Sequence, residues 1–286
     1  MSMTRSPFER FAEQKTQAAE SAAVYPLQTE REGVTESTLA IIGNDWTTHY
    51  YDGAFQLVDP PPALPSVTLV FVQSNDGNTG AANPATLGGG PTDLHVIYEG
   101  LSRVAADAVL AGAASVRGAD VFFSVWHPAL VALRRALALP RHPAQIVVSA
   151  SGRIDLDRGL LFNVPEARVF VLAGAQCRER CAAGFASRPW ITLLPLEPED
   201  LVSALARLRT DHGVRRISAI GGRTTASSLI DAGVVQDLCL TTSARAGGQP
   251  NTPLYIGRRP PALDLIVRKV GTDPVYPIVF EHLAFR

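Results

Sequence analysis

The feature that most constrains the fold is an alternation of short apolar runs with helix-like stretches, which continues from Pro65 to the C-terminus. The runs are rich in Val, Ile and Leu and are apolar on both faces. This pattern is typical of parallel strands in a sheet that helices cover on both sides. We therefore predict an α/β fold with a mixed, mainly parallel sheet.

The chain divides into an N-terminal extension, residues 1–60, and a main domain, residues 61–286, with the proline-rich run Asp59–Pro65 as a stiff connection. The extension should carry a frayed or surface helix in its first twenty or so residues. The strands expected are Leu39–Ile42, Val67–Val72, Asp107–Gly112, Val121–Val125, Gln145–Ser149, Arg168–Ala173, Trp190–Leu194, Arg216–Ile220, Asp237–Thr242 and Pro277–Phe285. The helices expected in the main domain are Asp93–Ala105, Pro128–Leu139, Glu199–His212 and Thr224–Ala232.

Composition excludes several classes of protein. A length of 286 residues, 46% of them hydrophobic, is enough for a large core, and a net charge of -1 without a basic stripe argues against nucleic-acid binding. No stretch is apolar for long enough to cross a membrane, and the N-terminus has no signal-peptide pattern. Three cysteines without paired metal-ligand spacing favour a reduced, cytoplasmic location and no metal site.

Two consecutive glycines follow the strand expected at Arg216–Ile220. In a parallel sheet, ligands bind at the carboxyl ends of the strands, where loops lead into helices. Gly221 and Gly222 would let a pyrophosphate approach the backbone, and Thr224 or Thr225 could cap the following helix. A tight turn that only needs a positive φ angle explains the same glycines equally well.

Three further strand ends carry candidate ligand-binding loops. Two hydroxyls and a guanidinium in the Ser149–Arg153 loop suit an additional phosphate and so favour NADPH over NADH, although a solvated turn has the same composition. Small residues after Gly112 would admit a flat ring or a ribose, or would serve only close packing. In the loop after Val72, Asp76 could orient a polar substrate, or it could simply belong to an Asn-Asp-Gly turn.

Together these loops resemble the pyrimidine reductase family, the reductase domain of riboflavin biosynthesis (RibD C-terminal type), within the dihydrofolate-reductase-like superfamily. The resemblance covers Pro65 to the C-terminus and rests on the order and spacing of the motifs. The residues that carry it are Ser74–Gly77, Tyr98–Arg103, Asp107–Gly112, Ser115–Arg117, Ser149–Arg153, Gly221–Gly222 and Asp237–Leu240.

The resemblance implies a homodimeric, cytoplasmic, NADPH-dependent reductase with the three-layer dihydrofolate-reductase-like fold. Its small-molecule substrate would be a pyrimidine, as in 5-amino-6-(5-phosphoribosylamino)uracil reductases. By position, the cofactor would be bound by Gly112, Ser115, Val116, Ser149, Ser151, Arg153, Gly221, Gly222, Arg223, Thr224 and Thr225. Asp76 would be catalytic, and Ser74, Asn75, Asn78 and Arg103 would contact the substrate.

The sequence departs from the family pattern mainly on the substrate side. Asn75 and Asn78 replace the Leu and Lys of the family's Ser-Leu-Asp-Gly-Lys loop, so a substrate phosphate would lack a cation there. Ile220 stands where the family commonly has Glu, and Ala114-Ser115-Val116 replaces Gly-Thr-Val. Two alternatives therefore stay open: a reductase of another heterocycle or carbonyl compound, and a non-catalytic NADPH-binding protein.

Overall fold

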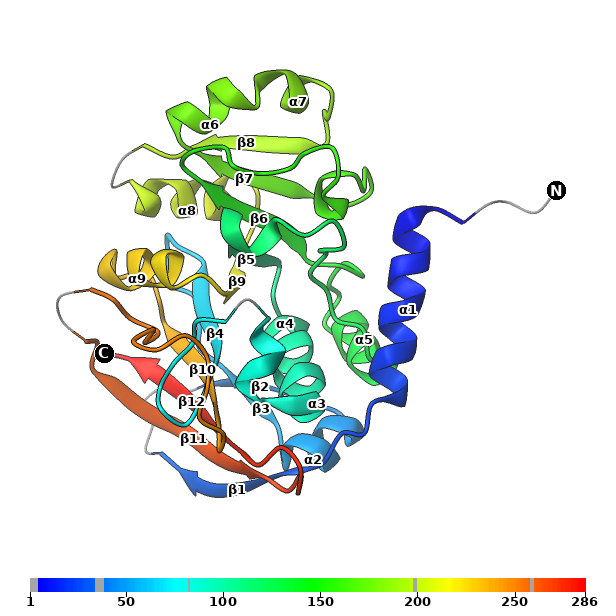
Figure 1. The fold of residues 1–286 in the computed structure, drawn as a ribbon, viewed down its shortest axis with the longest axis vertical. Coiled ribbons are helices and arrows are strands. Elements are labelled where there is room, and N and C mark those ends of the chain that lie inside the picture. The colour runs from blue at the N-terminus through cyan, green and yellow to red at the C-terminus, as the bar shows by residue number, and fades with distance from the viewer. Residues whose placement is uncertain (1–4, 34–38, 82, 198–199, 258–259) are drawn as a thin grey trace.

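The computed structural model describes residues 5–33, 39–81, 83–197, 200–257 and 260–286. Its sheet has ten strands in the order β1-β11-β12-β10-β4-β9-β5-β6-β7-β8, and it runs through the molecule from β1 at the bottom of Figure 1 to β8 at the top. The seven strands from β10 to β8 in this order are parallel to one another, and β12, β11 and β1 extend the sheet antiparallel from β10. The predicted mixed, mainly parallel sheet is confirmed.

The strands are β1 Leu27–Glu32, β2 Ala40–Ile42, β3 Phe55–Leu57, β4 Ser66–Gln73, β5 Ala108–Gly112, β6 Ala144–Ser149, β7 Val169–Ala173, β8 Ile191–Pro195, β9 Arg216–Ile220, β10 Asp237–Ser243, β11 Leu263–Gly271 and β12 Ile278–Phe285. The α-helices are α1 Pro7–Ser21, α2 Asp45–Tyr51, α3 Gly90–Thr92, α4 Ser102–Val104, α5 Pro128–Ala136, α6 Ala175–Arg180, α7 Ala182–Ala186, α8 Leu201–Thr210 and α9 Arg223–Asp231. A π-helix, η2 Asp93–Leu101, joins α3 to α4, and short 3-10 turns lie at η1 Pro84–Leu87, η3 Ala113–Val116 and η4 Leu160–Phe162.

The sheet has an apolar core on each face because its strands alternate in period two. Leu110 on β5 belongs to the core that α8 and α9 cover, and its neighbours Val109 and Ala111 belong to the core on the side of η2 and α5. The helices therefore form one layer on each face, as the uniformly apolar strands predicted.

One predicted strand, Val121–Val125, is wrong. These residues are extended but belong to neither sheet, because β6 occupies the position beside β5. The buried side chain of Gln145 takes the place of a strand partner: its Oε1 accepts from the N–H of Phe123 at 3.0 Å, and its Nε2 donates to the carbonyl of Phe123 at 2.9 Å. The backbone groups are thus satisfied without a ladder.

Three strands were not predicted: β3, which pairs with β2 in the small second sheet, and the two strands β1 and β11. Both carry charged residues and lie at the antiparallel edge, where β1 pairs with β11 from Leu27 opposite Gly271 to Glu32 opposite Val267. Part of the N-terminal extension therefore joins the main sheet. The predicted helix starting at Glu199 is observed as α8, and Glu199 itself lies outside the described residues.

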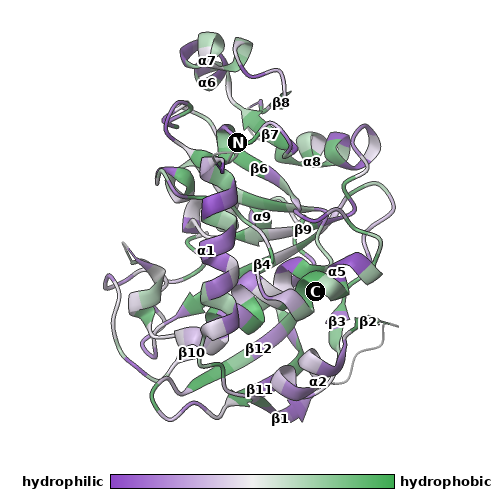
Figure 2. Cartoon of the chain, turned by 90° about the vertical axis from the view of Figure 1, so that its right-hand side faces the viewer, coloured by the Kyte–Doolittle hydropathy of each residue, from purple (hydrophilic) through white to green (hydrophobic). Residues whose placement is uncertain are grey.

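The aromatic groups of residues 39–58 are packed within the same chain. Tyr51 and Phe55 are 0% and 2% exposed, and Tyr51 packs against Phe280 of β12. Helix α1 lies along the side of the molecule that faces the viewer in Figure 2, where much of it has the colour of hydrophilic residues, and its Phe8 and Phe11 pack against Phe122 and Trp126. None of the helices in the described parts of the chain combines the length and apolar character that crossing a membrane requires.

Candidate active site

The parallel strands β4, β5, β6, β9 and β10 have their carboxyl ends on the same side of the sheet, and the predicted cofactor residues gather there. Gly221 and Gly222 follow β9 with φ angles of 65° and 82°, in the region that favours glycine. A Cβ on Gly112 would lie 2.5 Å from Oγ1 of Thr225, and one on Gly221 would lie 3.2 Å from Oγ of Ser115. The loops after β5 and β9 are therefore in direct contact, as ligand binding across both would require.

Helix α9 begins earlier than predicted. Gly222 occupies the N-cap position, and no side chain accepts a hydrogen bond from the first turn. The predicted capping by Thr224 or Thr225 is wrong, because both positive φ angles turn the chain so that the helix starts at Arg223. The N–H groups at this helix end are left without a side-chain partner, and they carry the positive end of the helix dipole.

The loop after β6 combines a structural residue with an available cation. Ser149 is buried, and its Oγ accepts from the N–H of Gly152 at 3.1 Å, which fixes the turn. Gly152 has a φ angle of 70° and rests on the backbone of Cys177. Arg153 is exposed, and no carboxylate in the described parts of the chain pairs with it. In this loop, Arg153 is therefore the residue whose exposed guanidinium is available to bind a phosphate.

Asp76 ties its own loop to the loop near Gly247. Its Oδ1 accepts from Oγ of Ser74 at 2.6 Å and from the N–H of Gly247 at 3.2 Å, and its Oδ2 accepts from Nδ2 of Asn78 at 2.8 Å. The hydrogen bond from Ser74, followed by those from Gly247 and Asn78, lowers the pKa of Asp76. A carboxylate so fully bonded within the fold is suited to holding the loops together, and its catalytic role stays a prediction.

The structure does not bring Arg103 to this edge. The helical segment from α3 to α4 starts at the carboxyl end of β4 and ends beside the start of β5, so Arg103, on α4, lies toward the opposite edge. Its side chain is 1% exposed, donates to the carbonyl of Ser124 at 3.2 Å and stacks on the ring of Tyr98. Of the four predicted substrate residues, Ser74 and Asn78 are buried within the Asp76 loop and Asn75 is exposed.

Sequence reasoning missed Asp93, at the start of the π-helix. Its side chain packs near Thr241 on β10, and burial raises its pKa to about 6, an effect that the Thr241 hydroxyl partly offsets. Thr241 pairs in register with Val72 of β4, one residue from the end of that strand. The sequence signal was the run Gly88-Gly89-Gly90, immediately before the helical segment. Consecutive glycines indicate that the backbone comes close to neighbouring side chains, which here are those of Ser243, Asp93 and Tyr276.

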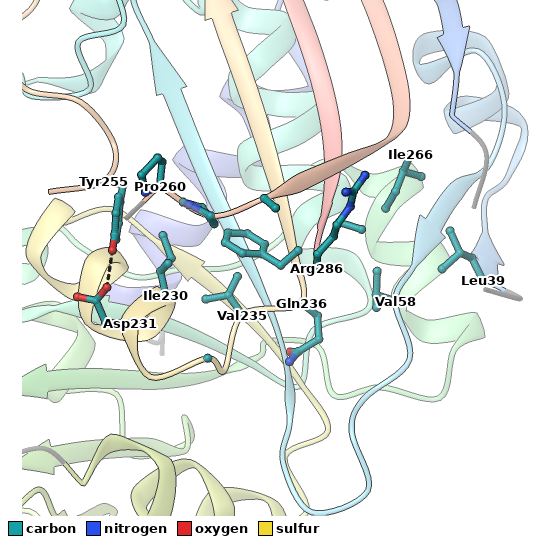
Figure 3. Close-up of a pocket in the computed structure, with 15 residues that line it drawn as sticks. Leu39, Val58, Ile230, Asp231, Val235, Gln236, Tyr255, Pro260, Ile266 and Arg286 are labelled. Atoms are coloured by element: carbon teal, nitrogen blue, oxygen red, sulfur yellow. Dashed lines mark hydrogen bonds between the residues drawn. The ribbon is translucent and has the colours of Figure 1, made fainter. Parts of the chain in front are cut away.

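A pocket of about 600 Å³ lies where strand β10 begins, at the end of the sheet opposite to the predicted cofactor loops, and takes no part in this site. Its lining includes Val235 and Gln236, just before β10, and Arg286, just after β12 (Figure 3). Tyr255 donates to Oδ1 of Asp231 at 2.6 Å across one side of it. Because β10 starts at this edge, the pocket is separated from the strand ends where the predicted cofactor residues meet.

Comparisons with known proteins agree with this architecture. The sequence model of the RibD C-terminal domain matches residues 65–274. A search of curated proteins found no match. Among solved structures, a pyrimidine reductase-like protein from Corynebacterium diphtheriae is similar with a TM-score of 0.60 at 18% identity, over 78% of this chain and 92% of that one.

Two longer proteins are similar over part of their length. RibD of Acinetobacter baumannii matches with a TM-score of 0.57 at 16% identity, over 79% of this chain and 59% of that one. A diaminohydroxyphosphoribosylaminopyrimidine deaminase/5-amino-6-(5-phosphoribosylamino)uracil reductase of Thermotoga maritima matches with a TM-score of 0.53 at 15% identity, over 78% of this chain and 57% of that one. These structural likenesses establish the fold, and the matched family covers most of the sequence. The chain belongs to the RibD C-terminal domain family.

Proposed function

We propose that this chain is an NADPH-dependent reductase that transfers hydride to a pyrimidine substrate of the 5-amino-6-(5-phosphoribosylamino)uracil type, in riboflavin biosynthesis. Membership of the RibD C-terminal domain family supports the proposal. So do the names of the similar structures, one of which is a reductase of this aminouracil. We further propose that the enzyme is cytoplasmic and dimeric and that residues 1–60 form an extension of the reductase domain.

The contact between the loops after β5 and β9 is the observation that carries the proposal. Gly112, Gly221 and Gly222 leave the backbone bare where Ser115 and Thr225 offer hydroxyl groups, and the N-terminus of α9 has no side-chain cap. Bare backbone, free N–H groups and hydroxyls are the donors that a pyrophosphate binds. These residues would hold the dinucleotide, which would supply the hydride.

Arg153 would distinguish NADPH from NADH. It follows β6, which lies next to β5 on the side away from β9, so Arg153 and the glycines after β9 flank the end of β5. A guanidinium without an internal carboxylate partner can pair with the 2′-phosphate in two places.

The chain's own residues would do the remaining work by positioning the acceptor and excluding water. The Asp76 loop and the Gly247 loop, joined by the bonds described above, would form the wall on the β4 side. Strand β4 lies between β10, which leads to the Gly247 loop, and β9, which leads to the predicted dinucleotide-binding glycines. The acceptor would therefore sit over the end of β4, between these two loops.

One observation favours a different acceptor on the same scaffold. Asn78 is 6% exposed and its amide is used in full, since Nδ2 donates to Asp76 and Oδ1 accepts from the N–H of Thr252 at 3.1 Å. It therefore offers nothing to a substrate phosphate. A heterocycle or carbonyl compound that lacks this phosphate is the second candidate substrate.

Isothermal titration with NADPH and NADH, followed by turnover of 5-amino-6-(5-phosphoribosylamino)uracil, tests the proposal. We expect NADPH to bind more tightly and to be oxidised when the aminouracil is present. Oxidation of NADPH by pterins or simple carbonyl compounds, but not by the aminouracil, would select the second candidate. NADPH binding without any turnover would indicate a non-catalytic protein, and no binding of either dinucleotide would reject the function.

A further inference from the structure

A second pocket, of about 320 Å³, lies between helices α1 and α5, which are side by side in Figure 1. Its apolar wall follows one face of α5, because Val131 and Ala132 come three and four residues after Pro128. Trp126, just before the helix, extends this wall, and Thr16 of α1 adds a hydroxyl group. None of the lining residues belongs to the loops after β5, β6 or β9, so this pocket is separate from the proposed dinucleotide site.

Two arginines, Arg135 and Arg141, supply the charge of this pocket. Both are exposed, and neither pairs with a carboxylate in the parts of the chain that the structure describes. Nη1 of Arg141 donates to the carbonyl of Val125 at 2.8 Å, which holds the guanidinium 5.7 Å from the centre of the Trp126 ring. An anion in the pocket would therefore meet two cations beside an aromatic wall.

The positive charges around the pocket repel one another. Burial and then the charge of Arg135 lower the pKa of Arg141. Burial, followed by the charges of Arg141 and Arg134, lowers the pKa of His142 to about 4, so this ring is neutral at physiological pH. Asp107 partly offsets the repulsion at Arg134, but its carboxylate already accepts from two backbone N–H groups. A bound anion would relieve the repulsion that remains.

A structural role accounts for Arg134 but not for Arg135. Arg134 is 1% exposed and donates to the carbonyls of Pro140 and Ala106, each at 2.6 Å, so it ties the end of α5 to the start of β5. This buried cation also complements the negative end of the α5 dipole. The side chain of Arg135 lines the pocket and makes no hydrogen bond with the described residues. Its charge is thus free to bind a ligand.

Trp126 gives an independent indication of a ligand. Its side chain lines the pocket and is 0% exposed to solvent, and its Nε1 has no hydrogen-bond partner among the described residues. By contrast, Nε1 of Trp190 donates to the carbonyl of Phe162 at 3.0 Å. A buried donor without an acceptor costs free energy, so such groups call for an explanation. An oxygen atom of a bound anion would supply the acceptor that the fold leaves out.

We propose that this pocket binds a phosphate monoester that carries an aromatic ring. The ring would pack against Trp126 and the apolar face of α5, and the phosphate would lie between Arg135 and Arg141. A phosphate dianion matches the two charges, and each guanidinium can donate to two of its oxygens. The volume lies at the lower end of the range for small-molecule sites, which suits one ring and one phosphate. The proposal does not depend on the proposed function.

Isothermal titration of the full chain with phenyl phosphate, with and without saturating NADPH, tests the site. We expect one molecule to bind per chain in both conditions. Inorganic phosphate and benzyl alcohol should each bind more weakly, because each keeps only part of the contacts. Binding that NADPH prevents would place the phosphate at the dinucleotide loops and would overturn the proposal. So would equal affinity for inorganic phosphate and phenyl phosphate, or no binding of phenyl phosphate at millimolar concentration.

Charge variants test the two arginines. Arg135→Gln and Arg141→Gln should each weaken phenyl phosphate binding about tenfold, and the double variant should abolish it. Arg153→Ala, on the proposed dinucleotide loop, is the matched control and should keep the wild-type affinity. Unchanged affinity in both single variants would overturn the proposal. Because Arg135 is exposed and makes no hydrogen bond with the described residues, its variant keeps the test available if Arg141→Gln does not fold.

A steric variant tests the position of the ring. Ala132→Leu adds bulk to the apolar wall at an exposed helix position and should abolish phenyl phosphate binding. Ala136→Leu, exposed on the same helix but outside the lining, should leave binding unchanged. In ¹H–¹⁵N spectra, the indole signal that Trp126→Phe removes should shift when phenyl phosphate is added to the wild type. An unmoved signal, or affinity that survives Ala132→Leu, would overturn the proposal.

Discussion

Replacing Asp93 by Asn should make the protein more stable at neutral and alkaline pH. In the folded protein, burial raises the pKa of Asp93 from 3.8 to about 6. Between these values the folded state binds more protons than the unfolded state, so the free energy of unfolding falls as pH rises. At about 1.36 kcal/mol per pKa unit, the loss amounts to about 3 kcal/mol above pH 7 and vanishes below pH 3.8. Asn is nearly isosteric with Asp and carries no charge at any pH.

Urea unfolding of the wild type and Asp93→Asn at pH 5, 6, 7 and 8 measures this effect. The difference in unfolding free energy between the two proteins should increase in favour of Asn from pH 5 through pH 6 and level off by pH 8, at a gain of about 1.4 kcal/mol relative to pH 5, because about half of the total loss already occurs below pH 5. Thr241→Val is the matched control: it removes the neighbouring hydroxyl and should steepen the wild-type loss. A difference that does not change with pH would refute the reasoning, because it would mean that Asp93 has the same pKa in both states.

Four further outcomes are expected. Arg153→Ala should weaken NADPH binding about ten- to hundred-fold and hardly change NADH binding, as titration of both dinucleotides would measure; equal weakening would mean that Arg153 does not contact the 2′-phosphate. Gly222→Ala should cost about 1–2 kcal/mol in thermal unfolding, because its φ angle is 82°, and should weaken both dinucleotides; an unchanged melting temperature would contradict the strain. Asp76→Asn should leave NADPH affinity unchanged and speed hydrogen exchange at the N–H of Gly247, whereas lost turnover with unchanged exchange would place this carboxylate on the substrate. Light scattering at micromolar concentration should give twice the monomer mass, and a monomer mass would reject the proposed dimer.

The parallel part of the fold could be predicted because each of its strands is apolar on both faces. A strand such as β7, Val169–Ala173, needs no partner's sequence to be recognised, since burial on both sides leaves it no polar positions. The antiparallel strands β1 and β11 could not be found this way. The charged residues of β1 are exposed at the edge of the sheet, whereas Lys269 of β11 is buried, and the pairing of the two strands depends on a contact between segments more than 230 residues apart.

The glycines of the predicted cofactor loops can be recognised in the sequence, whereas the buried carboxyl of Asp93 cannot, for a physical reason. Gly221 and Gly222 are read directly from a strand followed by a helix, because the need for bare backbone is local. Asp93 gains its raised pKa from burial by the Gly88–Gly90 loop and by β10; the glycine run is visible in the sequence, but its packing against Asp93 and the neighbouring strand are not. In the sequence, Asp76 is a carboxylate at a strand end; in the structure, Ser74, Asn78 and Gly247 donate hydrogen bonds to its two oxygens, and its catalytic role stays a prediction.

The bond between Gln145 and Phe123 also bears on how the chain emerges from the ribosome. The segment around Phe123 has the sequence of a strand, and the side chain that bonds to its backbone, that of Gln145, lies 22 residues further along the chain. At about 5–20 residues per second, that partner is synthesised about 1–4 seconds later. During this interval an apolar, strand-competent segment has no native partner and can pair with another nascent chain. The position of Gln145 thus sets how long the backbone of Phe123 waits for its native hydrogen-bond partner during synthesis.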